Sequence, residues 1–317
     1  MNSVAVIGAG AWGTALAIQA ARAGRSVTLW ARDPARILSN RENPRLPGHI
    51  LPDAIRVTGE FPNGELVLLA VPLQHFRKIA ARLPVGGPVV VCAKGVEAGS
   101  LKLPLEILDQ VLPGRPAAVL TGPNFAHEIA AGLPAAAVVA ATDPALRVAV
   151  VAALATPGFR LYGNDDPVGA QVGGAAKNVV AIAAGAVIGA GFGENARAAL
   201  VTRGLAELMR LAVALGGRAE TVAGLSGLGD LLLTCAGASS RNYSLGIELG
   251  RGRALEEILA GRSGVTEGVA TAPALVARAG RAGASVPICE AVAAVLTGRI
   301  TVRQAMDALQ ARPLRDE

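Results

Sequence analysis

The stretch Ser3-Val-Ala-Val-Ile-Gly-Ala-Gly-Ala-Trp-Gly13 decides the fold of the N-terminal half of the chain. Its first five residues are largely apolar and β-branched, which predicts a short buried strand, and the helix-like segment Thr14–Ala23 follows the glycines. Gly24 ends that helix, and Ser26–Trp30 has the pattern of a second strand. Strand, glycine-rich turn, helix and strand together make one βαβ unit.

The glycines of this turn match the spacing G-x-G-x-x-G, and each has a steric reason. Gly8 permits the tight turn, Gly10 lets the backbone approach a pyrophosphate, and Gly13 lets helix and strand pack closely. The helix that follows directs its unpaired N–H groups and positive dipole end at the phosphates. In a chain with 39 glycines the spacing alone is a weak indication, and a turn that only packs is the alternative. The strand–turn–helix context predicts dinucleotide binding.

Further strand patterns alternate with helical or loop segments as far as residue 140, which indicates a parallel sheet with helices on both faces. The polar, turn-forming stretch Gly163-Asn-Asp-Asp-Pro167 ends this pattern, so we expect a domain boundary between residues 165 and 166. The expected strands are Leu66–Val71, Pro88–Ala93, Ala117–Thr121 and Ala135–Ala140.

Residues 166–317 are expected to form a helical domain, because helical patterns separated by glycine-rich turns replace the strands. The predicted fold class is therefore α/β, with a Rossmann-like doubly wound sheet in residues 1–165 and an all-α domain after it. The expected helices are Gln171–Ala190, Glu194–Leu215, Ser244–Leu249, Ala254–Ala260, Thr271–Ala279, Ser285–Leu296 and Thr301–Leu309.

Composition limits the function classes. The net charge is +6, but the arginines are scattered singly without interleaved aromatics, which argues against nucleic-acid binding and suits a small anionic substrate. Three cysteines without C-x-x-C spacing indicate neither a disulfide framework nor zinc, and three dispersed histidines indicate no metal site. The N-terminus shows no signal-peptide pattern, and the apolar run Val179–Gly193 is shorter than a spanning helix. We expect a cytoplasmic protein without an integral membrane segment.

The end of the second strand indicates which dinucleotide binds. NAD enzymes place a carboxylate there for the ribose diol, whereas NADP enzymes often place an arginine near the 2′-phosphate. The exit is Trp30-Ala-Arg-Asp33, with Arg32 before the only carboxylate. This order favours NADPH and leaves NADH possible, and the alternative is that Arg32 is a solvated turn residue.

Two lysines stand out because the 30 basic residues include only four lysines. Lys94 follows a predicted strand, at the sheet edge where open α/β sheets bind ligands. Lys177 precedes an apolar helix, so we expect its ammonium to emerge from an apolar wall, which lowers a lysine pKa. A lysine, unlike an arginine, can give a proton to the alkoxide that forms when a ketone is reduced. Surface lysines are the alternative.

An anion site is predicted where Ser239-Ser-Arg-Asn242 begins a helix. A hydroxyl, a guanidinium and a helix N-terminus together suit a phosphate, although a serine that only caps the helix is the alternative. Asp230 lies in a glycine-rich turn and could hold a substrate hydroxyl or the catalytic ammonium, or could only cap Leu231–Cys235.

These residues resemble the bacterial type of NAD(P)-dependent sn-glycerol-3-phosphate dehydrogenases. The resemblance extends over nearly the whole chain, with the motifs in the family's order. The matching segments are Val6-Ile-Gly-Ala-Gly-Ala-Trp-Gly-Thr-Ala-Leu-Ala17, Ala93-Lys-Gly95, Thr121-Gly-Pro-Asn-Phe-Ala-His-Glu128, Lys177-Asn178, Gly224-Leu-Ser-Gly-Leu-Gly-Asp-Leu231, Ser240-Arg-Asn242 and Val265-Thr-Glu-Gly268.

The resemblance implies reversible reduction of dihydroxyacetone phosphate to sn-glycerol 3-phosphate for glycerophospholipid synthesis, a homodimer, and a helical domain like that of 6-phosphogluconate dehydrogenase. Lys177 would exchange the proton at the C2 oxygen, with Lys94 and Asp230 beside it. The other implied substrate contacts are Gly122, Asn124, Ser240, Arg241 and Asn242. The implied cofactor contacts, besides the three glycines, are Ala11, Trp12, Arg32, Lys94, Ala126, Arg241, Val265 and Glu267.

Two positions depart from the family's commonest pattern, and two other functions remain open. Ala11 replaces a frequent serine, which leaves only backbone contact there, and Asn124 replaces a serine or threonine. A β-hydroxyacid dehydrogenase of the same architecture would need a carboxylate site instead of the Ser-Arg-Asn turn. An NADPH-sensing regulator without catalysis would need neither Lys177 nor a second anion site.

Overall fold

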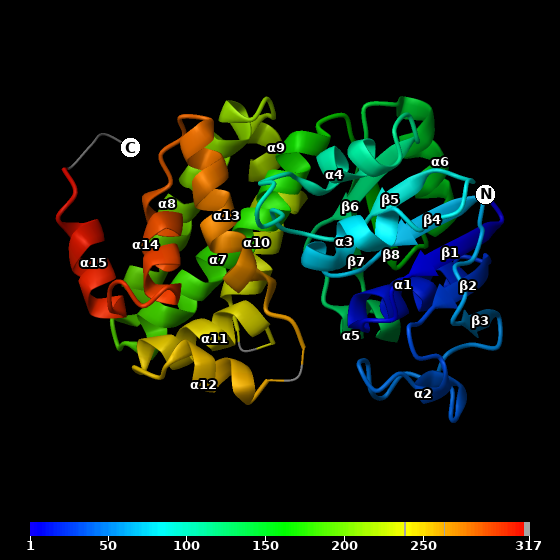
Figure 1. Cartoon of the computed structure of the whole chain (residues 1–317), viewed down its shortest axis with the longest axis horizontal. Helices are drawn as coiled ribbons and strands as arrows, with labels where there is room; N and C mark the ends of the chain where they lie inside the picture. Colours follow the sequence, from blue (N-terminus) through cyan, green and yellow to red (C-terminus); the bar gives the residue numbers. More distant parts are fainter. Residues whose placement is uncertain (238, 263, 314–317) are drawn as a thin grey trace. The chain divides into compact units, whose positions relative to one another are not determined.

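The computed structural model describes residues 1–237, 239–262 and 264–313, which divide into two compact units (Figure 1). The first unit consists of Met1–Lys94 and Leu103–Gln171, and the second of Gly95–Lys102 and Val172–Glu317. The short segment Gly95–Lys102 thus belongs to the helical unit. The sequence analysis expected one boundary between residues 165 and 166, which would have placed this segment in the first domain.

An eight-stranded sheet forms the centre of the first unit, as far as the structure describes it, in the order β3-β2-β1-β4-β5-β6-β7-β8. The order reverses between β1 and β4, as in doubly wound folds. The strands are β1 (Ser3–Ile7), β2 (Ser26–Trp30), β3 (Ile55–Thr58), β4 (Leu66–Leu69), β5 (Val89–Val91), β6 (Ala117–Thr121), β7 (Ala135–Ala140) and β8 (Phe159–Asn164).

The prediction of a wholly parallel sheet is wrong at one pair, because β6 and β7 run antiparallel with Val119 opposite Ala140. All other neighbours are parallel. Strands covered on both faces are apolar throughout, whatever their direction, so the sequence pattern does not tell whether a strand runs parallel or antiparallel to its neighbour. The edge strands β3 and β8 were not predicted, since β3 has four residues and β8 mixes polar with apolar residues.

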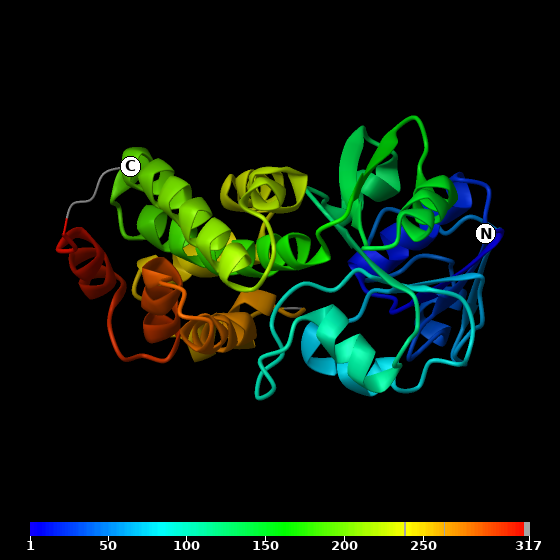
Figure 2. The same cartoon turned by 90° about the horizontal axis from the view of Figure 1, so that it is seen from above.

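Alternate residues of the strands point into two separate cores. Val4 and Val6 of β1 belong to the core under helices α1 (Ala11–Arg22), α5 (Ala126–Ala131) and α6 (Pro144–Leu154). Ala5 and Ile7 belong to the core under α3 (Leu73–Ala80) and α4 (Pro104–Val111). Figure 2 shows these two helix layers on opposite sides of the sheet, and the short α2 (Ala35–Leu38) follows β2.

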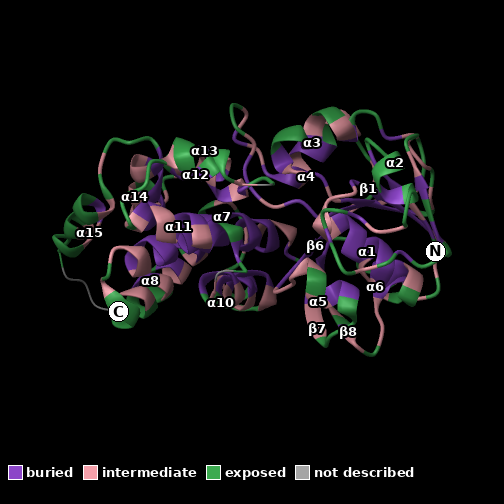
Figure 3. Ribbon diagram, turned by 90° about the horizontal axis from the view of Figure 1, so that it is seen from below, coloured by how far each residue is buried: buried purple, intermediate pink, exposed green. Residues whose placement is uncertain are grey.

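Helix α7 (Pro167–Gly189) is the central element of the second unit (Figure 3). It has 23 residues, so the expectation of a run too short to span a membrane is wrong on length. Its most apolar 18-residue window is 89% buried inside the fold, which is typical of a core helix. The other helices are α8 (Gly193–Ala214), α9 (Ala219–Ala223), α10 (Asp230–Cys235), α11 (Arg241–Gly250), α12 (Leu255–Ala260), α13 (Glu267–Arg281), α14 (Pro287–Leu296) and α15 (Val302–Gln310).

Helices α7 and α11 touch backbone to backbone through four glycines. A methyl group at Gly185 would lie 2.0 Å from the Tyr243 carbonyl oxygen, and one at Gly246 would lie 2.0 Å from that of Ile182. Gly189 and Gly250, each one turn further along, are equally crowded by the facing backbone. Small residues allow helices to approach this closely, which fits a chain with 3% aromatic residues.

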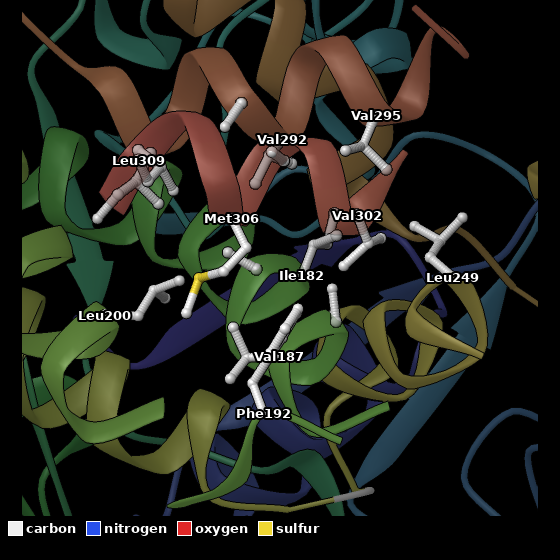
Figure 4. Close-up of a pocket in the computed structure, with 15 residues that line it drawn as sticks. Ile182, Val187, Phe192, Leu200, Leu249, Val292, Val295, Val302, Met306 and Leu309 are labelled. Atoms are coloured by element: carbon white, nitrogen blue, oxygen red, sulfur yellow. The ribbon is translucent and has the colours of Figure 1, made fainter. Parts of the chain in front are cut away.

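The bundle is less tightly filled beneath α15. A cavity of about 40 Å³ lies there among apolar side chains of α7, α8, α11, α14 and α15, and Figure 4 shows them turned toward one space. An ordered water needs two to four polar partners, so this lining favours a dry void. The labelled residues are Ile182, Val187, Phe192, Leu200, Leu249, Val292, Val295, Val302, Met306 and Leu309.

We predict that Gly246→Ala destabilises the second unit by roughly 1–3 kcal/mol, because the added methyl forces α7 and α11 apart. The free energy of unfolding, measured by urea denaturation and circular dichroism, checks this. Gly280→Ala is the matched control, since that helical glycine is exposed and has no atom near its missing Cβ. The control should gain roughly 0.5–1 kcal/mol from helix propensity. Equal effects of the two substitutions would contradict the close helix contact.

Candidate active site

The glycine-rich turn lies at the carboxyl end of β1, where the strand order reverses. Gly8 has a φ of +115°, and a Cβ there would lie 2.6 Å from the carbonyl oxygen of Ala70, which follows β4. A Cβ at Gly13 would lie 1.8 Å from the Gly8 carbonyl oxygen. The missing Cβ of Gly10 faces open space, so a ligand can approach the backbone there. Each glycine therefore meets the steric condition that its motif position requires.

Helix α1 begins at this turn with its first N–H groups uncapped by a side chain. Gly10 is the N-cap residue and the first turn contains no acidic residue, so nothing in it competes with an anion for the helix N-terminus. The buried amide of Asn43 donates to the Ala9 carbonyl, at 3.1 Å, and to Thr14 Oγ1, at 2.6 Å. Asn43 therefore holds the glycine-rich turn in place. It comes from a loop in which the sequence analysis found no motif.

Arg32 and Asp33 have different surroundings at the end of β2. The Asp33 carboxylate accepts an ion pair from Arg36 at 2.9 Å. Arg32 is exposed and has no hydrogen bond or ion pair among the described residues. The guanidinium is therefore available to an added phosphate, while the neighbouring carboxylate already has a cation.

A second polar group of the first unit surrounds the end of β6. Lys94 Nζ donates to the Gly122 carbonyl oxygen at 3.3 Å, and Gly122 has a φ of +140°, which favours glycine. Asn124 donates to the Ala136 carbonyl, but its Oδ1 is buried without a partner among the described residues. The same holds for Oγ1 of Thr121, which is 3% exposed and which the sequence analysis missed. Buried oxygens that lack a hydrogen-bond partner, here at the carboxyl end of β6, suit a ligand that supplies hydrogen-bond donors.

The catalytic candidate Lys177 lies on α7, inside the second unit. Its Nζ lies 2.5 Å from Oδ1 of Asp230 and 2.8 Å from Oγ1 of Thr234, and the lysine is 8% exposed and the aspartate 1%. The expectation of an apolar wall around the ammonium is thus wrong, because a carboxylate and a hydroxyl face it. Such an ion pair stabilises the charged ammonium, the form that can donate a proton.

Local backbone geometry places Asp230 and Thr234 beside Lys177. A π-helical turn, η1 (Leu225–Gly229), leads directly into α10, and Asp230 lies in the first turn of that helix. Thr234 donates to the Asp230 carbonyl at 2.6 Å, one turn back, which fixes its hydroxyl beside the lysine. Burial raises the pKa of the neighbouring Cys235 thiol to about 12, so this cysteine stays protonated and uncharged.

Asn242 connects three helices. Its Nδ2 donates to Oδ1 of Asn178 at 2.9 Å, and its Oδ1 accepts the N–H of Gly268, in the first turn of α13, at 3.1 Å. A Cβ at Gly268 would lie 2.7 Å from that Oδ1. The amide predicted to bind substrate therefore has two internal partners, which hold α11 against the residue next to Lys177.

The predicted anion turn begins α11. Ser240 is the N-cap residue and its hydroxyl accepts the N–H of Tyr243, so the capping alternative is present in the structure. Arg241 is exposed beside Gly264, and its carbonyl accepts a bond from Arg262 at 2.8 Å. Burial lowers the pKa of the Arg262 guanidinium, and the positive charge of Arg241 acts in the same direction. Two guanidiniums at a helix N-terminus suit a phosphate, and Arg262 was missed by the sequence analysis.

The remaining predicted cofactor contacts divide between the units. Ala11, Trp12 and Ala126 are half-buried at the first turns of α1 and α5. Val265 is exposed before α13, and Glu267 begins that helix. Within the described residues, no group of three His, Cys, Asp or Glu side chains could hold a metal ion.

Comparisons with known proteins agree over both units. Residues 3–147 match the family described as NAD-dependent glycerol-3-phosphate dehydrogenase N-terminus, and residues 166–307 match its C-terminus. The glycerol-3-phosphate dehydrogenase (NAD(P)+) of Acidiphilium cryptum is 58% identical over 317 residues, covering 99% of this chain and 98% of the relative. That of Caulobacter vibrioides is 53% identical, covering 100% and 99%.

A solved structure gives the same result. The glycerol-3-phosphate dehydrogenase of Coxiella burnetii matches with a TM-score of 0.93 at 33% identity, covering 98% of this chain and 99% of that chain. The glycine turn, the lysine–aspartate pair and the arginine turn thus occur in a chain whose two halves match one family in order. This chain belongs to the family of NAD-dependent glycerol-3-phosphate dehydrogenases.

Proposed function

We propose that the chain reversibly reduces dihydroxyacetone phosphate to sn-glycerol 3-phosphate with NAD(P)H. The buried Lys177–Asp230 pair carries this proposal, because reduction of a ketone requires a proton donor at the oxygen. The bound nicotinamide supplies the hydride. Membership of the family supports both the substrate and the cofactor class.

Lys177 would give its proton to the C2 oxygen as negative charge develops there, and would take it back in the reverse direction. Asp230 and Thr234 hold the ammonium from two sides, 2.5 and 2.8 Å away, so its position is fixed before substrate arrives. Fixed hydrogen bonds of this kind reduce the reorganisation that the reaction requires.

The phosphate of the substrate would be bound by the turn before α11. Ser240, Arg241 and Asn242 are the proposed contacts, and Arg262 is added because its guanidinium bonds the same turn. Arginine suits a phosphate since its planar fork can make two parallel hydrogen bonds. Lys94, Gly122 and Asn124 are proposed as further substrate contacts, supported by the buried Asn124 oxygen that lacks a partner among the described residues.

The cofactor pyrophosphate would lie at Gly8, Gly10 and Gly13, where the backbone is open and the N-terminus of α1 is uncapped. Arg32 would bind the 2′-phosphate, so we propose a preference for NADPH over NADH. The other proposed cofactor contacts are Ala11, Trp12, Lys94, Ala126, Arg241, Val265 and Glu267.

The product would serve as the backbone of glycerophospholipids, and we propose that the chain works in the cytoplasm as a homodimer. Three buried cysteines, none of them in a disulfide, suit a reducing compartment. The proposed partner is a small phosphorylated substrate, with no nucleic acid involved.

We predict that NADPH oxidation, followed by absorbance, occurs with dihydroxyacetone phosphate and not with 3-oxo acids, because the anion site combines arginines with a helix N-terminus. The substrate panel separates the dehydrogenase from a β-hydroxyacid enzyme of the same architecture. Glycerol 3-phosphate should also raise the melting temperature in the presence of NADPH. Turnover of an oxo acid alone, or binding of NADPH without any turnover, would overturn the proposed function.

Lys177→Met should lower kcat by about 10²–10⁴-fold, because the unbranched side chain stays similar in shape and no longer has a proton to give. The substitution leaves Asp230 buried without its cation, so the double variant Lys177→Met/Asp230→Asn is measured with it to separate instability from catalysis. NADPH affinity, titrated by fluorescence, should stay within a factor of a few in both. Lys78→Ala, on the exposed face of α3, is the control and should keep full activity. Near-normal kcat in the methionine variant would remove Lys177 from the chemistry.

Arg32→Ala should raise the KM for NADPH by roughly tenfold or more, and leave the KM for NADH nearly unchanged, because only the former carries a 2′-phosphate. Steady-state kinetics with each cofactor at saturating substrate check this. Arg36→Ala is the matched control, since Arg36 already pairs with Asp33. A similar rise for both cofactors in Arg32→Ala would mean that this arginine does not distinguish them.

A further inference from the structure

The dipeptide Asn63-Gly64, directly before β4, has a chemistry that the proposed function does not use. The chain contains nine asparagines, and Asn63 is the only one that a glycine follows. An asparagine can lose its side-chain amide when the next backbone nitrogen attacks the side-chain carbonyl carbon and closes a ring. Glycine has no Cβ to hinder this attack, and its backbone adopts the required conformation most easily.

The nitrogen that would attack is not engaged in the fold. Among the residues that the structure describes, none accepts a hydrogen bond from the Gly64 N–H. The chain is anchored immediately afterwards, because the Glu65 N–H donates to Oγ of Ser3 at 3.1 Å. A bonded N–H would have to give up its partner before its nitrogen could attack. At Gly64 this cost is absent.

The side chain that would be attacked is equally accessible. Asn63 is exposed, and its amide has no hydrogen-bond partner within the described part of the chain. It lines an open recess at the amino ends of β1 and β4, so the water that must later open the ring can reach it. The residues that line this recess are Met1, Ser3, Asn63, Gly64, Glu65 and Gly87.

A cation lies near the Asn63 side chain. Nη2 of Arg115 is buried and has no hydrogen-bond partner among the described residues. This atom and Oδ1 of Asn63 lie 3.8 and 4.0 Å from the position that a Cβ on Gly86 would occupy. The Arg115 guanidinium is held in place, since it donates to the carbonyls of Gly87 and Pro84 at 2.9 and 2.8 Å. A fixed positive charge here stabilises the negative charge that develops on the attacked carbonyl oxygen.

We propose that Asn63 is a modification site, at which the folded chain deamidates spontaneously to isoaspartate. The Gly64 nitrogen forms a bond to Cγ of Asn63, and the side-chain nitrogen leaves as ammonia with the proton of that N–H. Water then opens the resulting succinimide. Addition of water to the main-chain carbonyl gives isoaspartate, and addition to the side-chain carbonyl gives aspartate. Water is the only co-reactant, and nothing is oxidised or reduced.

Isoaspartate would add one carbon to the main chain directly before β4, where the fold has little room. A Cβ on Gly64 would lie 2.8 Å from the nitrogen of Ala5 and 3.0 Å from the carbonyl oxygen of Leu66. Since β4 lies between β1 and β5, the added length disturbs the centre of the sheet, and the modified chain is less stable. The glycine-rich turn lies at the opposite end of β1, so the modification leaves it in place.

Ageing the full chain without substrate in mildly alkaline buffer tests the proposal. Mass spectrometry of the tryptic fragment 57–77 measures deamidation, and labelling with an isoaspartyl methyltransferase identifies the product. Asn63 should deamidate at least about tenfold faster than Asn40 and Asn195, which are also exposed but precede an arginine and an alanine. These two asparagines are controls within the same sample. Asn63→Gln should remove the label from this fragment, because glutamine would have to close a larger ring.

The same chain in denaturing urea gives the rate of deamidation without the fold. A folded rate within a factor of a few of this value supports the open site. A folded rate far below it would mean that the fold holds the amide, and would overturn the proposal, as would equal rates at Asn63 and Asn40.

Thermal unfolding tests the consequence for β4. The aged wild type should melt at a lower temperature than the fresh protein, and aged Asn63→Gln should not, because only the wild type forms isoaspartate there. An equal loss in both would contradict damage at Asn63. Reduction of dihydroxyacetone phosphate is assayed on the fresh samples, where its absence would count against the proposed reaction and not against this site.

Discussion

The backbone contact between α7 and α11 is the constraint on which the proposed chemistry of the second unit depends. Four glycines let the two helices run side by side, and this places the start of α11 beside Lys177 and Asn178. The Asn178–Asn242 hydrogen bond joins the two helices at that separation. A larger residue at one glycine would separate the lysine helix from the proposed phosphate turn, so packing and site geometry are one problem here.

Local chemistry explains which parts of the site the sequence could predict. The spacing of Gly8, Gly10 and Gly13 specifies a backbone conformation within six residues, and the structure shows the tight contacts that this spacing requires. The strand β2 and the order Arg32-Asp33 are also local, and the role of Arg32 at a 2′-phosphate stays a prediction. Where a backbone conformation is encoded in neighbouring residues, steric arguments from sequence are sufficient.

Contacts between distant segments could not be predicted in the same way. Asn43 reaches the glycine turn from 29 residues beyond Thr14, and Thr234 reaches Lys177 across 57 residues. Neither carries a motif of its own. The direction of β7 and the existence of β8 were hidden for a related reason, because side-chain patterns record burial and not pairing partners. The prediction of an apolar wall around the Lys177 ammonium was wrong for the same reason, since the carboxylate that faces the ammonium comes from α10.

The Lys177–Asp230 pair is better understood through the proposed reaction than through stability. Burying two charges is costly, and a buried pair often stabilises a fold no more than apolar residues would. In the proposed reaction the pair would instead serve a reversible proton transfer. If Lys177 gives up its proton in the proposed reaction, the buried Asp230 carboxylate loses the charge of this ammonium, a state of higher free energy. That state favours return of the proton, so in the proposed reaction the aspartate would prepare the lysine for both directions, and an arginine, which keeps its proton, could not replace the lysine.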